Sequence, residues 1–410
     1  MTILRTILVL FVFAFVFSGI KAQTTASSDF DSQPTLSWKY STGSPIIGSP
    51  VIEDNVVYAG STDGILYALN LTDGKEKWKY TTYGPIRSTV CIQNGLVFVL
   101  SGDGNLWAVD RQSGTFKWRF KTFTGFIGDR KYDYADYYAS SPIIYNKGIY
   151  FGCSDGRVYC VNIETGKLNW SYQTGDIVHT TPAIAQEKLF VGSYDGYVYA
   201  LNPTTGTLIW KFKSVGHRYF PRGEMTGNPA TTNNLVLIGG RDYYIYGIEQ
   251  NGGYCYWSRQ FPKGWALPIT VRDTVAYIGT SEDKELLAVD VRTGENIWKT
   301  NATFNIFGGC SFTSSMGYFG TLLGNAYGFD MKTGSLKWKF VTDGYTKNHL
   351  KYFKDDDTYR DDIGSILSGN DAVVMLYNDM GAIFSTPALT GSNIVITSAD
   401  GNVYCLKRGQ

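Results

Sequence analysis

The residue types that most often carry enzyme chemistry are sparse and scattered in this 410-residue chain. The three histidines, His179, His217 and His349, do not share the spacing of a metal-binding or catalytic motif. Glycine-rich phosphate loops are absent from the sequence. The six cysteines form neither a CxxC knuckle nor an adjacent pair, so the sequence predicts no disulfide framework and no cysteine-held metal.

Two groups of aspartates need separate interpretations. Residues 355–357, with Asp361 and Asp362, have the composition of a calcium loop, but Tyr359 and Arg360 stand where an EF-hand needs a ligand and a glycine. A solvated loop is therefore favoured there. Other aspartates precede a glycine in a recurring turn, and we interpret them as turn carboxylates that cap backbone amides. They are Asp63, Asp103, Asp155, Asp195 and Asp400.

The elements that hold these residues follow from an internal repeat with a period of about forty residues. Each repeat has two apolar runs, an Asp-Gly turn, an alternating run, a Thr-Gly or Ser-Gly turn and a tryptophan-bearing run, which together predict four short strands. The tryptophans are Trp38, Trp78, Trp118, Trp170, Trp210, Trp257, Trp298 and Trp338.

Such a unit cannot bury both of its faces alone, so we predict a ring of stacked sheets. Seven repeats are complete, and residues 385–407 supply three strands of an eighth that lacks its tryptophan strand. Residues 36–40 form a tryptophan strand without partners. Joining the two ends predicts an all-β, eight-bladed propeller over residues 35–410 whose last blade is closed by the N-terminal strand, so that no open sheet edge remains.

Strand alternation puts the connections between blades on the same face as the Asp-Gly hairpins. Three connections are enlarged, at residues 120–139, 212–228 and 340–386, and crowd this face. Three residues before each inner strand lies a position expected at the mouth of the central channel. Reading around the ring gives Ile47, Arg87, Ala139, His179, Thr226, Trp265, Phe307 and Phe384.

This set has the composition of a small-molecule pocket with apolar walls and a few polar groups. The predicted ligand-binding residues are Arg87, His179, Trp265, Phe307 and Phe384. The favoured alternative is that the same side chains plug the channel. A second candidate surface is the tyrosine-rich insertion at residues 131–138, because exposed tyrosines are enriched in recognition surfaces. Its predicted partner-binding residues are Tyr132, Tyr134, Tyr137 and Tyr138, and the alternative is a loop that packs on its own blade.

The repeated pattern GSxDGxxYALNxxTGxxxW, seen at residues 192–210, resembles the repeat of pyrroloquinoline-quinone (PQQ)-type propellers. The resemblance covers essentially all of the chain after residue 34. It implies the fold but not one function, because this family includes quinone-dependent alcohol dehydrogenases as well as propellers without cofactor, such as a bacterial outer-membrane assembly scaffold and a luminal stress sensor.

The resemblance also implies what a quinone enzyme needs: a disulfide between neighbouring cysteines, a tryptophan beneath the quinone, and a Glu-Asn-Asp set for calcium. No adjacent cysteines exist here. Trp265 is a candidate plate and Glu224, Asn228 and Asp242 are candidate calcium ligands, but they lack the family's spacing. We therefore assign no catalytic residue and no metal ligand.

The charge composition of the chain limits the classes of partner that we expect. Lys+Arg 37 against Asp+Glu 36 give a net charge of +1, which argues against nucleic acid. Residues 1–22 have a basic Arg5, an apolar run and a small residue, Ala22, as in a cleaved signal peptide, and residues 23–34 are expected to be a linker. We therefore expect a secreted or, in a bacterium, periplasmic monomer without a membrane anchor. The sequons at Asn70, Asn169 and Asn301 make it a candidate glycoprotein.

The leading hypothesis from sequence is a non-catalytic scaffold that binds a protein or glycan partner through the enlarged-loop face. No cofactor is assigned. The alternative hypothesis is an oxidoreductase of the alcohol or sugar dehydrogenase type, with PQQ and calcium at the channel mouth.

Overall fold

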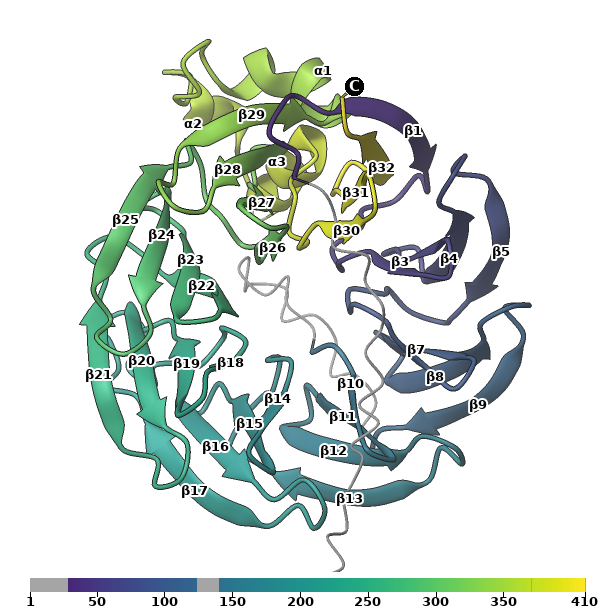
Figure 1. Cartoon of the computed structure of the whole chain (residues 1–410), viewed down its shortest axis with the longest axis vertical. Coiled ribbons are helices and arrows are strands. Elements are labelled where there is room, and N and C mark those ends of the chain that lie inside the picture. Colours follow the sequence, from purple (N-terminus) through teal and green to yellow (C-terminus); the bar gives the residue numbers. More distant parts are fainter. Residues whose placement is uncertain (1–28, 124–139, 370, 410) are drawn as a thin grey trace, which may run out of the picture.

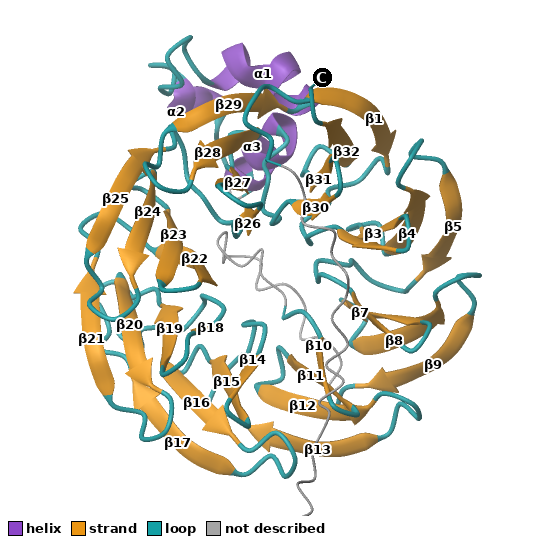
Figure 2. Ribbon diagram, in the orientation of Figure 1, coloured by secondary structure: helices purple, strands orange, loops and turns teal. Residues whose placement is uncertain are grey.

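The fold is described from a computed structural model over residues 29–123, 140–369 and 371–409. Eight four-stranded antiparallel sheets stand around a central axis like the blades of a propeller (Figure 1), and three helices lie at one part of the ring (Figure 2). This confirms the predicted all-β, eight-bladed fold.

Blades 1 to 4 are consecutive in sequence, each running from the innermost to the outermost strand. Blade 1 contains β2 (Val51–Glu53), β3 (Val56–Gly60), β4 (Ile65–Asn70) and β5 (Glu76–Thr81). Blade 2 contains β6 (Cys91–Gln93), β7 (Leu96–Ser101), β8 (Asn105–Asp110) and β9 (Phe116–Lys121). Blade 3 contains β10 (Ile143–Tyr145), β11 (Gly148–Gly152), β12 (Arg157–Asn162) and β13 (Leu168–Gln173). Blade 4 contains β14 (Ala183–Ala185), β15 (Lys188–Gly192), β16 (Tyr197–Leu201) and β17 (Leu208–Lys213).

Blades 5 to 8 continue the ring. Blade 5 contains β18 (Ala230–Thr231), β19 (Leu235–Gly239), β20 (Tyr244–Glu249) and β21 (Cys255–Gln260). Blade 6 contains β22 (Ala266–Arg272), β23 (Val275–Thr280), β24 (Glu285–Asp290) and β25 (Asn296–Asn301). Blade 7 contains β26 (Ser311–Phe312), β27 (Met316–Gly320), β28 (Asn325–Asp330) and β29 (Leu336–Val341). Blade 8 contains β30 (Ala388–Thr390), β31 (Asn393–Thr397), β32 (Asn402–Lys407) and, outermost, β1 (Thr35–Ser41).

The recurring tryptophans join neighbouring blades. Trp38 donates from Nε1 to the carbonyl of Leu71 in the next blade at 2.7 Å, and its ring lies against Gly74. A Cβ at Gly74 would sit 2.6 Å from that ring, and its φ of +70° also favours glycine. The same Nε1-to-carbonyl bond recurs from further tryptophans, namely Trp78, Trp170, Trp210, Trp257, Trp298 and Trp338.

The repeated aspartates cap their hairpins, as predicted. Asp63 accepts the backbone N–H of Ile65 on Oδ1 at 2.9 Å and the hydroxyl of Tyr67 on Oδ2 at 3.0 Å. The backbone part of this arrangement recurs at the other predicted turn carboxylates, Asp103, Asp155, Asp195 and Asp400. These carboxylates are therefore held by the turn, in agreement with their interpretation as caps of backbone amides.

The ring closes through the N-terminal strand, as predicted. β1 pairs antiparallel with β32, with Trp38 opposite Cys405, and β1 lies beside the end marked C in Figure 1. In the other blades, the turn between the third and fourth strands receives the tryptophan of the preceding blade. In blade 8 these strands are β32 and β1, which come from opposite ends of the chain, so this turn is missing. Phe30 replaces this turn: its carbonyl accepts Nε1–H of Trp338 at 2.7 Å, and its N–H donates to the hydroxyl of Tyr318 at 2.9 Å.

The segment expected as a linker thus has a packed part where the structure describes it. The ring of Phe30 is fully buried, and the carboxylate of Asp29 accepts the N–H of Ser315 at 3.0 Å and its hydroxyl at 2.7 Å. Residues 29–30 therefore fix the N-terminal strand to blade 7 as well as to blade 8.

Each connection between blades begins beside a hairpin, which identifies one face of the ring. Thr82 donates its N–H to the carbonyl of Gly64 at 2.8 Å, and Ser214 and Thr342 make the matching bonds to Gly196 and Gly324. We call this edge the loop face and the opposite edge the turn face. The enlarged connections at 212–228 and 340–386 both start on the loop face, as predicted, whereas most of 120–139 lies outside the described residues.

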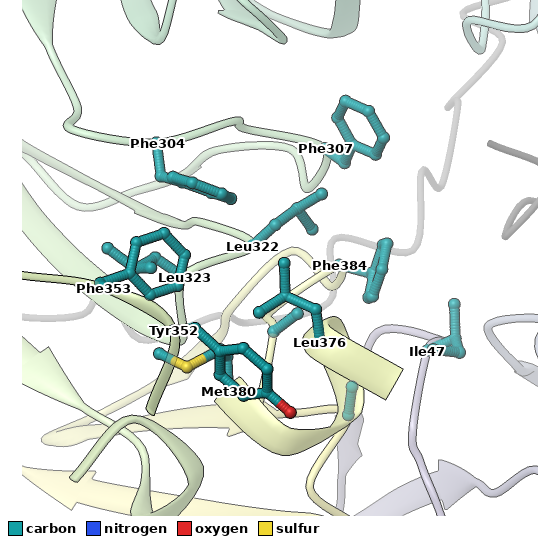
Figure 3. Packing of buried hydrophobic residues seen from close by; sticks show 12 residues of the cluster. Ile47, Phe304, Phe307, Leu322, Leu323, Tyr352, Phe353, Leu376, Met380 and Phe384 are labelled. Carbon is teal, nitrogen blue, oxygen red and sulfur yellow. The ribbon is translucent and has the colours of Figure 1, made fainter. Parts of the chain in front are cut away.

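The 340–386 connection contains helices that the sequence analysis did not predict. They are α1 (Asp343–Tyr352), α2 (Ile363–Ile366) and α3 (Ala372–Met380). Thr342 caps α1 by accepting the N–H of Tyr345, and Gly381 ends α3 in the left-handed conformation. Leu376 and Met380 of α3 pack into the apolar cluster on the loop face, shown in Figure 3. The helices therefore cover part of blades 7 and 8.

All six cysteines are free thiols. The sequons differ in exposure: Asn169 and Asn301 are exposed and Asn70 is half-buried. Along the described chain, no helix is both long enough and apolar enough to cross a bilayer.

The role of Phe30 in closing the ring predicts a large stability cost when its ring is removed. Phe30→Ala should lower the free energy of unfolding by about 3–5 kcal/mol, because a fully buried ring leaves a cavity. Denaturant unfolding measures this change. Leu36→Ala in the same N-terminal region, where the side chain is 50% exposed, is the control and should change stability little. An equal effect of both substitutions would contradict the assigned role.

Candidate functional site at the channel mouth

A belt of side-chain hydrogen bonds lines the central channel. The N–H of Ser49 in blade 1 donates to Oγ1 of Thr89 in blade 2 at 3.0 Å, and the N–H of Thr89 donates to Oγ of Ser141 in blade 3 at 2.9 Å. The belt continues through bonds between blades 3 and 4, 4 and 5, 7 and 8, and 8 and 1. These inner hydroxyls are thus used to join the blades.

The belt differs on both sides of blade 6. Pro268 stands at the belt position of blade 6 and has no N–H to donate, and Gly309 of blade 7 has no side chain to accept one. Thr270 substitutes by accepting the N–H of Cys310 at 3.0 Å. This irregular sector is where the channel wall departs most from the repeat.

The predicted mouth residues are only partly brought together. A cavity of about 170 Å³ in the channel is lined by Ile47, Arg87, Thr226, Phe307 and Phe384, together with the belt residues. This places two polar and three apolar members of the predicted set around one cavity. Ala139 lies outside the described residues.

Trp265 is not at the position predicted for it. Its carbonyl accepts the N–H of Ser281 at 2.8 Å, a bond that Pro45 makes with Thr62 in blade 1. Blade 6 has one residue fewer between this position and its inner strand, so Leu267 lines the cavity in place of Trp265. The sequence alignment of blade 6 was therefore wrong at this point.

His179 lies beside the channel cavity, in a neighbouring hollow between blades 2 and 3. Arg87 lines both spaces, and Cys153 also lines this hollow. The ring of His179 is buried and its Nε2 lies 2.7 Å from Oγ of Ser154. Burial raises the pKa of the Cys153 thiol to about 12, so this thiol stays protonated and is a poor nucleophile at neutral pH.

Phe307 and Phe384 form an apolar wall beneath the helices. Both belong to a buried cluster with Ile47, Leu376 and Met380, and Figure 3 shows these side chains converging from blades 7 and 8 and from α3. The ring of Phe384 also contacts that of Tyr377 on α3 edge to face, with centroids 5.9 Å apart. On this side the residues therefore pack as core, in agreement with the plug interpretation.

A cluster of aromatic rings around one buried arginine, which the sequence analysis missed, lies at blades 4 to 6. The guanidinium of Arg241 is buried over the rings of Tyr194, Phe220 and Trp265, at 5.2, 5.9 and 5.3 Å from their centroids. Arg241 directly precedes a turn aspartate, Asp242, in a hairpin that departs from the repeat. The only sequence signal was an arginine at this hairpin position, where no other repeat has one.

Three buried polar atoms near this cluster have no hydrogen-bond partner among the described residues. They are Oε2 of Glu224, Oγ1 of Thr226 and Nε1 of Trp265. Thr226 is only 4% exposed and lines the channel cavity. A cavity of this size has room for water or a small polar ligand, which would supply the partners that buried polar atoms need.

The described residues do not fit PQQ with calcium. The carboxylate of Asp242 accepts the hydroxyl of Tyr246 and the N–H of Tyr244, and Oδ1 of Asn228 accepts the N–H of Thr181 at 2.7 Å. Burial raises the pKa of Asp242, although these hydrogen bonds oppose the shift. Across residues 29–123, 140–369 and 371–409, no three His, Cys, Asp or Glu side chains gather as a metal site.

The ring of Trp265 is also occupied. It meets Phe220 edge to face with centroids 5.7 Å apart and lies under the guanidinium of Arg241, so other side chains already pack on the ring that a quinone would need. We therefore derive no reaction step through this cofactor.

The acidic segment at residues 355–362 is tied into local contacts, in agreement with the loop interpretation. Asp357 lies 2.7 Å from Nε2 of His349 and accepts the hydroxyl of Tyr345 at 2.9 Å. Asp361 pairs with Lys354, and Asp362 pairs with Arg360. The predicted partner-binding residues Tyr132, Tyr134, Tyr137 and Tyr138 lie outside the described residues.

Together, the eight blades, the tryptophan docking and the closed ring define a tryptophan-docked propeller. The family described as outer membrane protein assembly factor BamB matches residues 25–197 and 194–355, and the chain belongs to this family. No curated protein sequence matches the chain.

Solved structures agree on the fold and differ in activity. BamB from Moraxella catarrhalis is 15% identical, with a TM-score of 0.67 over 92% of this chain and 100% of that chain. The quinohemoprotein alcohol dehydrogenase ADHIIG from Pseudomonas putida HK5 is 14% identical, with a TM-score of 0.68 over 93% of this chain and 78% of that chain. A europium-containing methanol dehydrogenase is 12% identical, with a TM-score of 0.68 over 93% and 95%. At these identities the likeness establishes the fold alone.

The poor fit predicts that PQQ and calcium do not stabilise this protein. Adding both to the full chain should leave its melting temperature unchanged, because a ligand that binds the folded state raises it by mass action. Differential scanning fluorimetry measures this. A rise that depends on both additives, accompanied by dye reduction with an alcohol, would contradict the assignment.

Proposed function

We propose that this protein is a secreted, monomeric, non-catalytic scaffold that binds a protein partner through its loop face, with a glycan as the alternative partner. The family is named for a factor in assembling outer membrane proteins, which supports a protein as the partner. The signal-peptide pattern of residues 1–22 supports secretion.

The observation that carries this proposal is the contrast between the two faces. The turn face repeats one structure: Asp110, Asn162, Asn202 and Asp330 each accept two backbone N–H groups in the same kind of turn. Such repetition gives a partner little to recognise. On the loop face the connections between blades differ in length, charge and helix content.

The loop face also exposes apolar and aromatic side chains on separate elements. Tyr83 is 80% exposed on a short connection, Val215 and Tyr219 stand out on the 212–228 connection, and Leu350 and Met375 stand out on α1 and α3. Exposed aromatic and methionine side chains on rigid loops are typical of recognition surfaces.

A cross-linking experiment tests which face is used. The tagged full chain is incubated with its native extract, treated with a lysine-reactive cross-linker and analysed by mass spectrometry. Cross-links to a captured protein should involve lysines of the loop face, Lys213, Lys263 and Lys347. They should be absent from exposed lysines of the turn face, Lys75, Lys147 and Lys332.

Both groups of lysines react with the cross-linker alone, which serves as the control for accessibility. Cross-links concentrated on the turn face would overturn the proposal. A reproducible failure to cross-link any protein, together with binding on a glycan array, would replace the protein partner with a glycan.

A further inference from the structure

The 212–228 connection contains a small hairpin that presents two side chains. His217 and Phe220 form a β-bridge, with the N–H of His217 donating to the carbonyl of Phe220 at 3.0 Å and the N–H of Phe220 donating back at 2.9 Å. Arg218 and Tyr219 are the two residues between them. They therefore occupy the tip of a two-residue turn on the loop face.

The hairpin is anchored on both sides. The ring of His217 stacks on that of Tyr243 with centroids 4.4 Å apart and planes at 23°. On the other side, Phe220 packs against Trp265 and lies under the buried guanidinium of Arg241. These contacts hold the tip in place, so little conformational entropy is lost when a partner binds.

The two tip residues are exposed and stack on each other. Tyr219 is 64% exposed, and the guanidinium of Arg218 lies 4.5 Å from the centroid of its ring. Arginine and tyrosine are enriched in binding hot spots, because both combine a large contact area with hydrogen bonding. A stacked arginine keeps its N–H groups free to meet a carboxylate in bidentate geometry.

Within the 212–228 connection basic residues outnumber acidic ones, although the chain as a whole carries a charge of only +1. Lys213 and Arg222 flank the hairpin and both are exposed. Arg222 pairs with Asp176 at 2.7 Å, whereas neither Arg218 nor Lys213 has a carboxylate partner within the described chain. The single acid of residues 213–224 is Glu224, and its Oε2 is buried.

We infer that the Arg218–Tyr219 tip recognises an acidic segment of the partner protein. This inference rests on the proposed function and names the chemistry of the partner at one part of the loop face. A partner carboxylate would pair with Arg218, a neighbouring partner side chain would pack on Tyr219, and Lys213 would add attraction at longer range.

Purified full-length protein and a short fluorescein-labelled peptide of Glu, Asp and Leu test this inference by fluorescence anisotropy. The wild type should bind this peptide, should not bind a matched peptide with Lys in place of the acids, and should bind more weakly as salt is added. Arg218→Glu should weaken binding by about tenfold or more, and Tyr219→Ala by about fivefold or more.

Two matched controls separate the tip from general charge and general aromatic effects. Arg292→Glu changes an exposed arginine on the turn face, and Tyr254→Ala removes an exposed tyrosine from the same face. Both should leave peptide binding unchanged. All four variants should keep the wild-type melting temperature, because each side chain is exposed.

The outcomes distinguish this inference from the proposed function. Absence of peptide binding, or binding that Arg218→Glu does not change, would overturn the acidic-segment inference. Tighter, Arg218-dependent binding of a sulfated oligosaccharide would overturn it in favour of an anionic glycan. Cross-links to a partner at Lys263 and Lys347 that persist in Arg218→Glu would also remove this inference while leaving the proposed function standing.

Discussion

The docking of each tryptophan on the next blade is the interaction on which the rest of this structure depends. It uses a glycine such as Gly74 beside the ring and a carbonyl acceptor at the end of a turn, as Leu71 provides for Trp38. Trp118 packs on its glycine without the carbonyl bond. The glycine and the acceptor both lie on the turn face, so that face is constrained to repeat one turn. The loop face has no such requirement, and its connections are free to differ. We therefore expect partner recognition on the loop face, where tryptophan docking does not constrain the sequence.

Ring closure extends this constraint to the chain ends. Seven blades receive their neighbour's tryptophan on a continuous turn, but blade 8 is interrupted between β32 and β1. Phe30 restores the missing carbonyl and fills the space beside Trp338 with its own ring. A ring closed at every junction limits relative motion of the blades, so the loops on its rim keep fixed positions. This rigidity is what allows separate connections to act as one surface.

The sequence was sufficient for the fold because the repeat specifies strands, turns and blade number together. The closing strand at Trp38 and the aspartate turns followed from the same pattern. Elements that depart from the repeat were not accessible in this way. The helices at 343–380 lie in the longest connection, where no repeat offers an alignment, and Trp265 was misplaced because blade 6 is one residue shorter before its inner strand. Arg241 was overlooked since its environment comes from three different blades.

A nearly neutral protein can still present a local positive charge when its acidic side chains are buried or paired and a basic side chain is exposed. In the 212–228 connection, Oε2 of Glu224 is buried, Arg222 is paired with Asp176, and Arg218 stands at an exposed tip. The cation–π contact with Tyr219 orients Arg218 without neutralising it, because an aromatic ring carries no net charge. Since the effect of a charge in water falls off within about 8 Å at physiological salt, a partner near this tip senses the local basic groups rather than the net charge of the chain. A net charge of +1 argues against a broadly charged ligand such as nucleic acid, but it does not argue against a short acidic segment.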